Sequence, residues 1–389
     1  MRYEIYWELA ADGGARILRV YGTTPEAVLP KQIEGIPVTE IGAYCFAAQA
    51  RLPESYNRTQ IEMPDTAAES AGAGMRSETG AGMQPEIAAG MRSEIGAGMQ
   101  PEKTGMQAIV DGKKKVSGMQ PESIGAGTPL TVSGMRELAG GYPTRIVIPD
   151  TVGKLGNFAF YNAVSLQTLA IGRRLTEIGS DAFMNCRNLH FLLLRCGRGE
   201  GSGLRQILAQ ISHDLEVSFV GEGGVWAKLL FPEYYESYDE IAPAHLFGRN
   251  IEGEGFRARQ SFRDGVMDFA QYDVIFPKAC AEEREETLCG LALNRLRYPV
   301  ELGEAPRRLY EEYLTAHAAA LCALLTGERD TELAEFLCRE HIFARADLER
   351  CIRYAAGDEW AEGSAYFLRL LNQYFPEKNV ASRYTFEDF

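Results

Sequence analysis

Basic residues are scarce in this sequence relative to acidic ones. The 40 Lys and Arg stand against 54 Asp and Glu, which gives a net charge of -14 and a pI near 5.0. Nucleic acids are normally bound by basic surfaces, and an anionic membrane surface selects for positive charge in the same way. We therefore expect neither a nucleic-acid partner nor a membrane partner.

Long apolar runs are also missing. No stretch approaches the roughly 20 apolar residues of a membrane-spanning helix. The N-terminus, MRYEIYWELAADGG, carries charges among its apolar residues and has no small-residue cleavage site, so we do not expect a signal peptide. The 8 cysteines are scattered and none stands in a C-x-x-C pair, which argues against a zinc or redox motif. These features predict reduced cysteines and a cytoplasmic protein.

The residue patterns of catalysis are absent as well. The 5 histidines share no metal-binding spacing such as H-E-x-x-H. Cys338 and His341 lie three apart on an expected helix and could form a Cys–His pair, but Cys338 shares an apolar stripe with Leu337, which favours a buried structural thiol. The glycine-rich stretch 197–203 follows a strand, as a phosphate-binding loop does, but it lacks G-K-[ST] and contains Glu200. We assign no catalytic, cofactor-binding or metal-binding residue and expect no enzyme.

What the sequence does contain is a repeat with a period of 23 residues. Its matched pairs, each 23 positions apart, are Ile148 and Ile171, Leu155 and Ile178, Gly156 and Gly179, Phe160 and Phe183, and Asn162 and Asn185. A fixed period of this length is the signature of a solenoid, because one unit cannot bury its apolar edge without a neighbour.

The residue types in the repeat indicate how each coil is built. Alternating apolar residues such as Ile146 and Ile148 suit a short strand with one buried face. Glycine permits a positive φ or a close approach of the neighbouring coil. Asn162 and Asn185 stand where the chain turns back, since asparagine tolerates the left-handed conformation. The recurring Phe residues should form one apolar spine with Phe46.

The pattern IPDTVGKLGNFAFYNAVSLQTL followed by IGRRLTEIGSDAFMNCRNLHFL resembles the BspA-like leucine-rich repeat family. The Ile-Pro-Asp strand end, the Leu/Ile-Gly pair, the Ala-Phe pair and the Asn turn carry this resemblance. A third copy runs from Gly35 to Phe46. The resemblance implies a solenoid used for binding and supplies no catalytic residues.

Together with the rest of the chain, the repeat predicts an α+β protein. We expect a short leucine-rich-repeat β-solenoid of three to four coils with an N-terminal hairpin cap, followed by an α-helical C-terminal domain. The helices are expected at Cys280–Arg297, Ala305–Leu325, Thr331–His341, Ala346–Ala356 and Trp360–Phe375. The expected divisions are a hairpin cap at 1–30, a first repeat part at 31–66, a low-complexity Gly/Met-rich disordered insert at 67–143, repeats and a capping helix at 144–211, a mixed aromatic and acidic junction at 212–276, a helical domain at 277–376 and a frayed tail at 377–389.

Two features at the edges of the solenoid complete these expectations. Thr59–Thr66 closely copies Thr144–Thr151, so it is expected to be a repeat strand duplicated at the boundary of the insert.

In the junction, tyrosines alternate with acids, and exposed tyrosines provide large contact area at low entropic cost. Burial of these rings at the junction is the competing interpretation. The candidate partner-binding residues are Tyr234, Tyr235, Tyr238 and Asp239.

The function that follows is a non-catalytic protein–protein interaction scaffold with an unknown protein partner and no cofactor. Two alternatives stay open. A carbohydrate- or surface-binding adhesin is the one that the family resemblance suggests. An enzyme with an unrecognised site in the helical tail would need a deep pocket with convergent polar groups.

Overall fold

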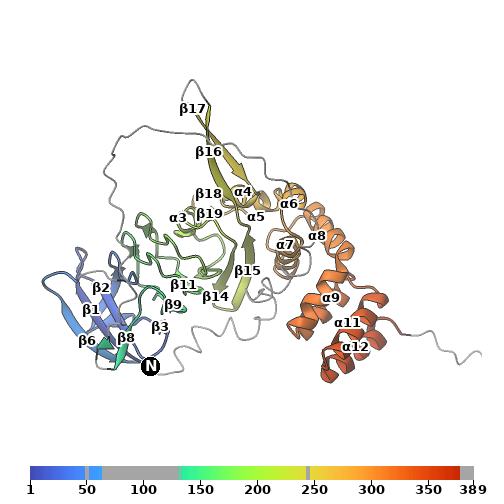
Figure 1. Ribbon diagram of the computed structural model, residues 1–389, viewed down its shortest axis with the longest axis horizontal. Coiled ribbons are helices and arrows are strands. Elements are labelled where there is room, and N and C mark those ends of the chain that lie inside the picture. The colour runs from blue at the N-terminus through green and yellow to red at the C-terminus, as the bar shows by residue number, and fades with distance from the viewer. Residues whose placement is uncertain (49–51, 64–130, 133, 242–245, 377–389) are drawn as a thin grey trace, which may run out of the picture. The chain divides into compact units, whose positions relative to one another are not determined.

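The structure is a computed structural model that describes residues 1–48, 52–63, 131–132, 134–241 and 246–376 (Figure 1). Its strands come mainly from the N-terminal part of the chain and its long helices from the C-terminal part. The expected α+β class, with a β-solenoid followed by a helical region, is confirmed. The tail 377–389 lies outside the described residues.

One face of the solenoid is a ladder of parallel strands. Adjacent strands hold the 23-residue register, so that Ile146, Leu169 and Leu192 stand side by side and are all buried. The ladder is longer than the repeat predicts, because one strand from outside the repeat extends it at each end. In spatial order its strands are β3 (Glu26–Val28), β9 (Arg145–Val147), β11 (Thr168–Gly172), β13 (Phe191–Arg195) and β14 (Leu215–Gly221).

A second parallel sheet lies on another side of the same coils. It joins Glu40 to Lys154 and Lys154 to Glu177 as register partners. The copy near the N-terminus is therefore a true coil, although more than a hundred residues separate it from the next one. The strands of this sheet are β5 (Ile36–Ile41), β10 (Lys154–Leu155) and β12 (Glu177–Ile178).

The expected aromatic spine is present. The ring centroids of Phe46 and Phe160 are 4.8 Å apart, and those of Phe160 and Phe183 are 5.5 Å apart, with interplanar angles of 8° and 7°. All three side chains are almost completely buried in one continuous core. The coils therefore share one apolar interior, which is the main source of their stability.

Glycine and asparagine occupy the positions that the coil geometry demands. A Cβ atom on Gly156 would lie 2.3 Å from the backbone nitrogen of Ala43 in the preceding coil, so only glycine allows this approach. Asn162 and Asn185 have φ angles of 57° and 64°, as expected for the turn. Their side chains form a ladder in which Asn185 Nδ2 donates to Asn162 Oδ1 at 2.8 Å.

The N-terminal hairpin caps the solenoid as predicted. Strand β1 (Arg2–Leu9) pairs antiparallel with β2 (Ala15–Gly22), and β2 pairs in parallel with β5. The short β4 (Gln32–Ile33) pairs antiparallel with the start of β5. The expectation that Thr59–Thr66 forms a repeat strand is wrong. This segment contributes to β6 (Asn57–Glu62), which lies antiparallel to β1, because Arg58 and Gln60 donate to the buried carboxylate of Glu4.

The low-complexity insert 67–143 falls largely outside the described residues, but its C-terminal end is described. The sequence predicts disorder up to residue 143, and this prediction is wrong for residues 131–132 and 134–143. Strand β8 (Met135–Glu137) pairs with β7 (Thr131–Val132) and with β2, and Met135 packs with Tyr6 and Tyr21. Leu138, which follows, is completely buried. Burial of these two apolar side chains offsets the cost of ordering the segment.

At the C-terminal end of the solenoid, β14 continues the ladder and β15 (Gly224–Phe231) folds back on it antiparallel. The expected capping helix is the short α3 (Leu204–Leu208). Beyond β15 the junction contains a second hairpin, which projects at the top of Figure 1, and several short elements. They are β16 (Tyr235–Ile241), β17 (Leu246–Glu252), α4 (Gly255–Ala258), β18 (Phe262–Arg263), β19 (Val266–Met267) and α5 (Phe269–Asp273).

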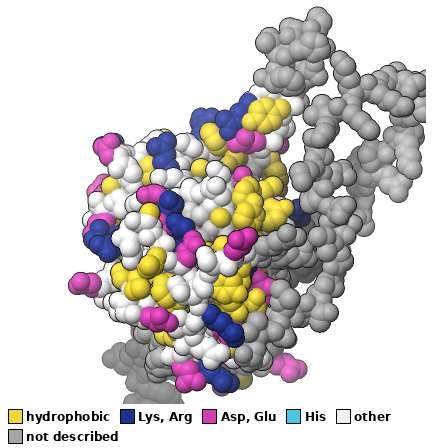
Figure 2. Space-filling model, turned by 90° about the vertical axis from the view of Figure 1, so that its left-hand side faces the viewer, with side chains coloured by type: hydrophobic (Ala, Val, Ile, Leu, Met, Phe, Trp, Pro, Cys, Tyr) yellow, Lys and Arg dark blue, Asp and Glu magenta, His cyan; other side chains and the backbone are white. Residues whose placement is uncertain are grey.

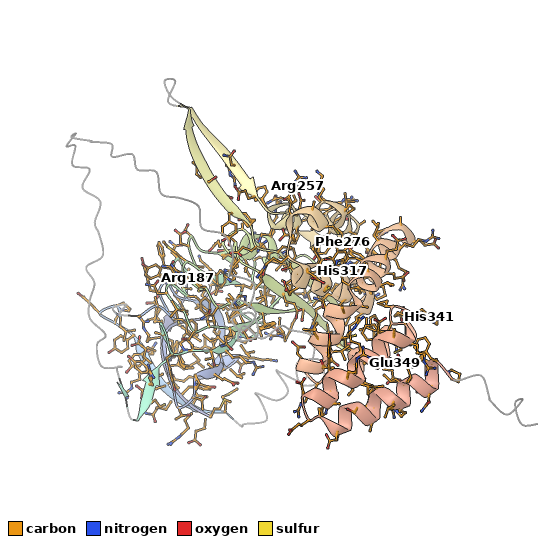
Figure 3. The ribbon with its side chains drawn as sticks, turned by 45° about the vertical axis from the view of Figure 1, so that its right-hand side comes forward. Arg187, Arg257, Phe276, His317, His341 and Glu349 are labelled. Carbon is orange, nitrogen blue, oxygen red and sulfur yellow. The ribbon has the colours of Figure 1, made fainter. Side chains whose placement is uncertain are left out.

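The helical region has more breaks than the sequence suggests. The expected helix Cys280–Arg297 is interrupted where Glu283 accepts from the Glu254 amide and Arg284 pairs with Asp214. The expected helix Ala305–Leu325 is interrupted at His317 (Figure 3), whose ring stacks on Tyr313 at 4.0 Å. The observed helices are α6 (Phe276–Glu282), α7 (Glu285–Arg297), α8 (Glu304–Ala316), α9 (Ala318–Gly327), α10 (Thr331–Arg339), α11 (Arg345–Gly357) and α12 (Ala361–Tyr374).

Candidate interaction site

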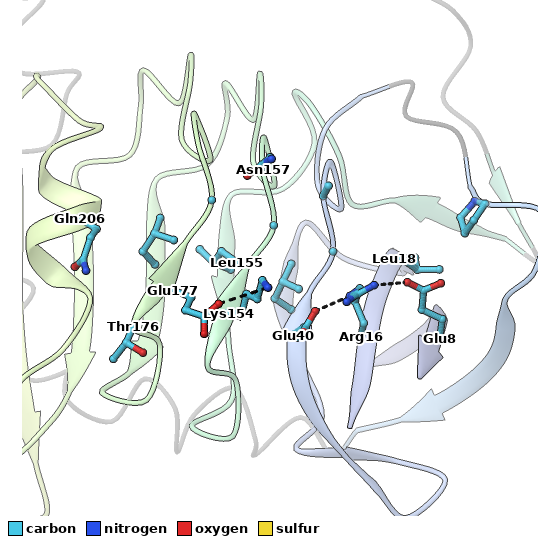
Figure 4. A pocket seen from close by; sticks show the side chains of 17 residues that line it. Glu8, Arg16, Leu18, Glu40, Lys154, Leu155, Asn157, Thr176, Glu177 and Gln206 are labelled. Atoms are coloured by element: carbon cyan, nitrogen blue, oxygen red, sulfur yellow. Dashed lines mark hydrogen bonds and ion pairs between the residues drawn. The ribbon is translucent and has the colours of Figure 1, made fainter. Parts of the chain in front are cut away.

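A broad groove of about 850 Å³ crosses the second parallel sheet and continues onto the hairpin cap (Figure 4). Its charged side chains come from successive strands, one from each. In spatial order they are Glu8 on β1, Arg16 on β2, Glu40 on β5, Lys154 on β10 and Glu177 on β12. A row of this kind follows directly from the stacking of coils, since equivalent positions of adjacent coils become neighbours.

The charges in the groove are paired with one another. Arg16 bridges Glu8 at 2.7 Å and Glu40 at 2.6 Å, and Lys154 lies 3.4 Å from Glu177. The hydrogen bond with Glu40 raises the pKa of Arg16 above its ordinary value, against the opposing effect of partial burial. Lys154 and Glu177 have side chains that are 47% and 71% exposed. The groove is therefore an open polar surface with both signs of charge.

The sequence carries a signal for this groove that does not belong to any catalytic or binding motif. In each copy, one charged residue stands directly before the apolar residue and glycine of the coil. The three stretches are Glu40-Ile41-Gly42, Lys154-Leu155-Gly156 and Glu177-Ile178-Gly179. The apolar residue points inward, so its charged neighbour on the strand must point outward. The glycine lets its coil lie close to the preceding one, which keeps the row continuous.

The four residues predicted to bind a partner do not form one surface. Tyr234 is only 8% exposed; its ring packs on Phe256 and under the guanidinium of Arg259, so it is not available to a partner. Tyr235 and Tyr238, on β16, are 62% and 63% exposed. Asp239 lies on the same strand, and its side chain is outside the described part of the structure. Tyr235 and Tyr238 remain candidates on the projecting hairpin, and Tyr234 does not.

The glycine-rich stretch 197–203 does not present an open anion site. The carboxylate of Glu200 accepts a hydrogen bond from the Gly197 amide at 2.6 Å and lies 3.3 Å from Arg173. The loop's own acid therefore occupies the position that a phosphate would need.

Cys338 and His341 do not form a catalytic pair. Cys338 is completely buried in α10, and burial raises the pKa of its thiol to about 12, so the thiol stays protonated near neutral pH. His341 is exposed at the edge of the helical region (Figure 3). Within the described residues, no three His, Cys, Asp or Glu side chains converge as metal ligands would.

The face of the molecule that carries the N-terminal strands is mixed in charge. Figure 2 shows the side that carries the N-terminal strands, where acidic, basic and hydrophobic side chains are interspersed. In the described part of the chain, no helix combines the length and the apolar character needed to cross a membrane.

Comparison with known proteins agrees with the geometry of the coils. Residues 142–195 match the family described as BspA type leucine rich repeat region (6 copies). Searches of curated proteins and of solved structures gave no significant match. The matched segment carries β9 to β13, the coils whose 23-residue register was described above. The repeats at residues 142–195 are therefore of the BspA leucine-rich repeat type, as the sequence pattern predicted.

Proposed function

We propose that the protein is a non-catalytic protein–protein interaction scaffold that binds its partner along the groove of the solenoid. The observation that carries this proposal is the row of side chains from five consecutive strands, which opens into a volume of about 850 Å³. A surface built from several coils suits an extended partner, because each coil offers an equivalent set of contacts. Leucine-rich repeats of this family are generally non-catalytic, which favours binding over an unrecognised reaction.

Electrostatics support a role in recognition. Exposed ion pairs contribute little to stability, about 0–1 kcal/mol each, so the row along the groove is not explained by folding alone. Charge patterns of both signs set the register and the selectivity of an interface more than its affinity. Tyr235 and Tyr238 on the hairpin β16–β17 offer a second contact area, as exposed aromatic residues do at many interfaces.

We place this activity in the cytosol. All 8 cysteines are free and 7 of them are buried, with Cys280 exposed. Unpaired thiols are typical of proteins that work in a reducing compartment.

The test is a charge swap that keeps both the ion pair and the net charge. The variant Lys154→Glu with Glu177→Lys inverts the pattern at the β10–β12 end of the row, where the two side chains lie 3.4 Å apart. A matched control is Arg307→Glu with Glu311→Arg, which inverts an exposed pair on α8 with a separation of 3.0 Å. The full chain is used as bait, the captured partner is identified, and its affinity is then measured with purified proteins by calorimetry.

We expect the groove swap to weaken binding of the partner by about tenfold or more, because each inverted charge would then face a partner group of the same sign. We expect the control swap to have little effect on binding. Equal affinity of the wild type and the groove swap would overturn the assignment to the groove. Capture of a glycan in place of a protein would instead favour a surface-binding adhesin.

A further inference from the structure

Two aromatic rings, one exposed and one half-buried, lie next to the lining of the groove, at what we call its rim. Tyr44 and Phe158 follow groove-lining residues by one position in adjacent coils, and their rings stack with centroids 5.0 Å apart at an interplanar angle of 15°. Tyr44 is 40% exposed, and Phe158 is half-buried. Tyr161 contacts the Phe158 ring edge-on at 5.9 Å. This cluster lies outside the aromatic spine of the core.

The backbone conformation at these two positions is unfavourable for aromatic residues. Tyr44 has a φ of 57° and Phe158 a φ of 56°. A bulky residue in this region is uncommon, because the left-handed conformation costs about 1–2 kcal/mol for most L-residues. The equivalent position of the next coil has the same conformation, with a φ of 52°, but it holds Asp181. The coil thus imposes the turn and does not require a ring there.

Asp181 therefore marks where the row of rings ends. Phe158 lies between Tyr44 and the coil of Asp181, and its amide donates to the carbonyl of Ser180 at 3.0 Å. In the order of the coils, the coil of Asp181 lies on the side of Phe158 opposite Tyr44. Asp181 is exposed and makes no ion pair with any of the residues that the structure describes. An aromatic face and a free carboxylate are thus next to each other at one point of the rim.

The groove beside this point adds further negative charge. It is lined by the acids Glu8, Glu40 and Glu177, and its cations Arg16 and Lys154 are each already paired with one or two of them. The chain as a whole has a net charge of -14. A flat cation matches both neighbours, since a guanidinium group stacks on an aromatic ring and pairs with a carboxylate at the same time. Lysine provides the charge without the planar stacking surface.

We infer that the rim and groove bind a basic, arginine-containing segment of a protein partner, with a guanidinium group placed between the face of Phe158 and the carboxylate of Asp181. This inference rests on the proposed function, because it names the chemistry of the partner that the groove takes. It adds one specific anchor point to an otherwise general charged surface.

The test uses a fluorescein-labelled peptide of alternating Arg and Gly, its Lys and Gly counterpart, and the full-length protein. Binding is followed by fluorescence anisotropy at low and at physiological salt. We expect the arginine peptide to bind several-fold more tightly than the lysine peptide, and this preference to persist at the higher salt. Equal binding of the two peptides would overturn the inference, since simple charge attraction predicts no difference.

Two variants probe the anchor directly. Phe158→Asn removes the ring without changing the net charge, and asparagine tolerates the positive φ of this turn. Asp181→Asn removes the carboxylate. Each should weaken binding of the arginine peptide by about tenfold, the effect of one desolvated cation–π or charge contact, and Phe158→Asn should reduce the preference for arginine over lysine. Unchanged binding of the arginine peptide to both variants would overturn the inference.

Matched controls lie elsewhere on the chain. Asp264→Asn changes an exposed aspartate with a φ of 51°, nearly the conformation of Asp181. Tyr354→Gln removes a tyrosine that is 40% exposed, as Tyr44 is. Both should bind the arginine peptide like the wild type, and equal losses in these controls would contradict a specific anchor. If the charge swap at Lys154 and Glu177 abolishes binding of the natural partner while Phe158→Asn does not, the proposed function stands and this inference fails.

Discussion

A buried carboxylate between the solenoid and the helical region should make the stability of the protein depend on pH. Glu328 follows α9, and both of its carboxylate oxygens are shielded from solvent without a hydrogen-bond partner among the described residues. Burial, and then the nearby carboxylates of Asp330 and Glu216, raise the pKa of Glu328 from 4.5 to about 7. Glu216 itself is held by Lys228 at 3.2 Å and by Asn294 at 3.0 Å.

The sign of the effect follows from proton binding. Between pH 4.5 and about pH 7 the folded protein keeps a proton on Glu328 that the unfolded chain releases. The free energy of unfolding therefore falls as the pH rises through this window. The full shift would correspond to about 3 kcal/mol. Because the side chain is only partly buried, solvent screening reduces the expected loss to about 1–2 kcal/mol.

The variant Glu328→Gln removes this ionisation. At about pH 8 its free energy of unfolding should exceed that of the wild type by about 1–2 kcal/mol, and at about pH 5 the two should agree within about 0.5 kcal/mol. Urea titrations of the full chain, followed by far-ultraviolet circular dichroism, measure the difference. Glu359→Gln, at an exposed turn between α11 and α12, is the control. A variant that gains no stability at the higher pH would refute the reasoning.

Three further substitutions test the core, the coil packing and the helical region by the same unfolding assay. Phe160→Ala removes the central ring of the spine and should cost about 3–5 kcal/mol, whereas a loss below about 1 kcal/mol would mean that the three rings do not share one core. Gly156→Ala should cost more than about 1 kcal/mol, because the new Cβ would meet the Ala43 nitrogen at 2.3 Å, and a neutral result would show that the coils can separate freely. Arg295→Met should cost about 3–5 kcal/mol because it leaves Asp273 buried without its cation, both side chains being at most 1% exposed and 2.6 Å apart. A stable variant would show that the pair can be dispensed with.

The coils could be predicted because their spacing fixes their register. A period of 23 residues places Phe160 beside Phe183 and Asn162 beside Asn185, whatever else the chain does. The copy that contains Phe46 joins the same stack, because its apolar residues and glycine meet identical steric demands.

The pairing of strand β6 could not be predicted from the repeat pattern. Its sequence copies a repeat strand, yet it pairs with β1, where Arg58 and Gln60 satisfy the buried Glu4. Local sequence similarity specifies a strand but not its neighbour, since the neighbour is chosen by contacts between distant segments. The end of the insert became ordered for a similar reason, through burial of Met135 and Leu138.

The candidate site was predicted only in outline. Three tyrosines within five residues all suggested a surface, but the packing of Arg259 against Tyr234 turned one of them inward. The charges at Glu40, Lys154 and Glu177 were visible in the sequence, although only the stacked coils turn them into a continuous row.

Hairpins at both ends of the parallel ladders have a consequence for how the protein can change in evolution. At one end the antiparallel hairpin β1–β2 meets β5, and the hydroxyl of Tyr3 accepts from the Val28 amide at the margin of β3. At the other end β15 covers the outer edge of β14. A coil appended outside either hairpin would meet an antiparallel strand of that sheet, and so could not continue the parallel pairing that joins the repeats. Repeats must therefore be gained or lost between the existing coils. An insertion or deletion of 23 residues, or of a multiple of 23, leaves both terminal hairpins in place.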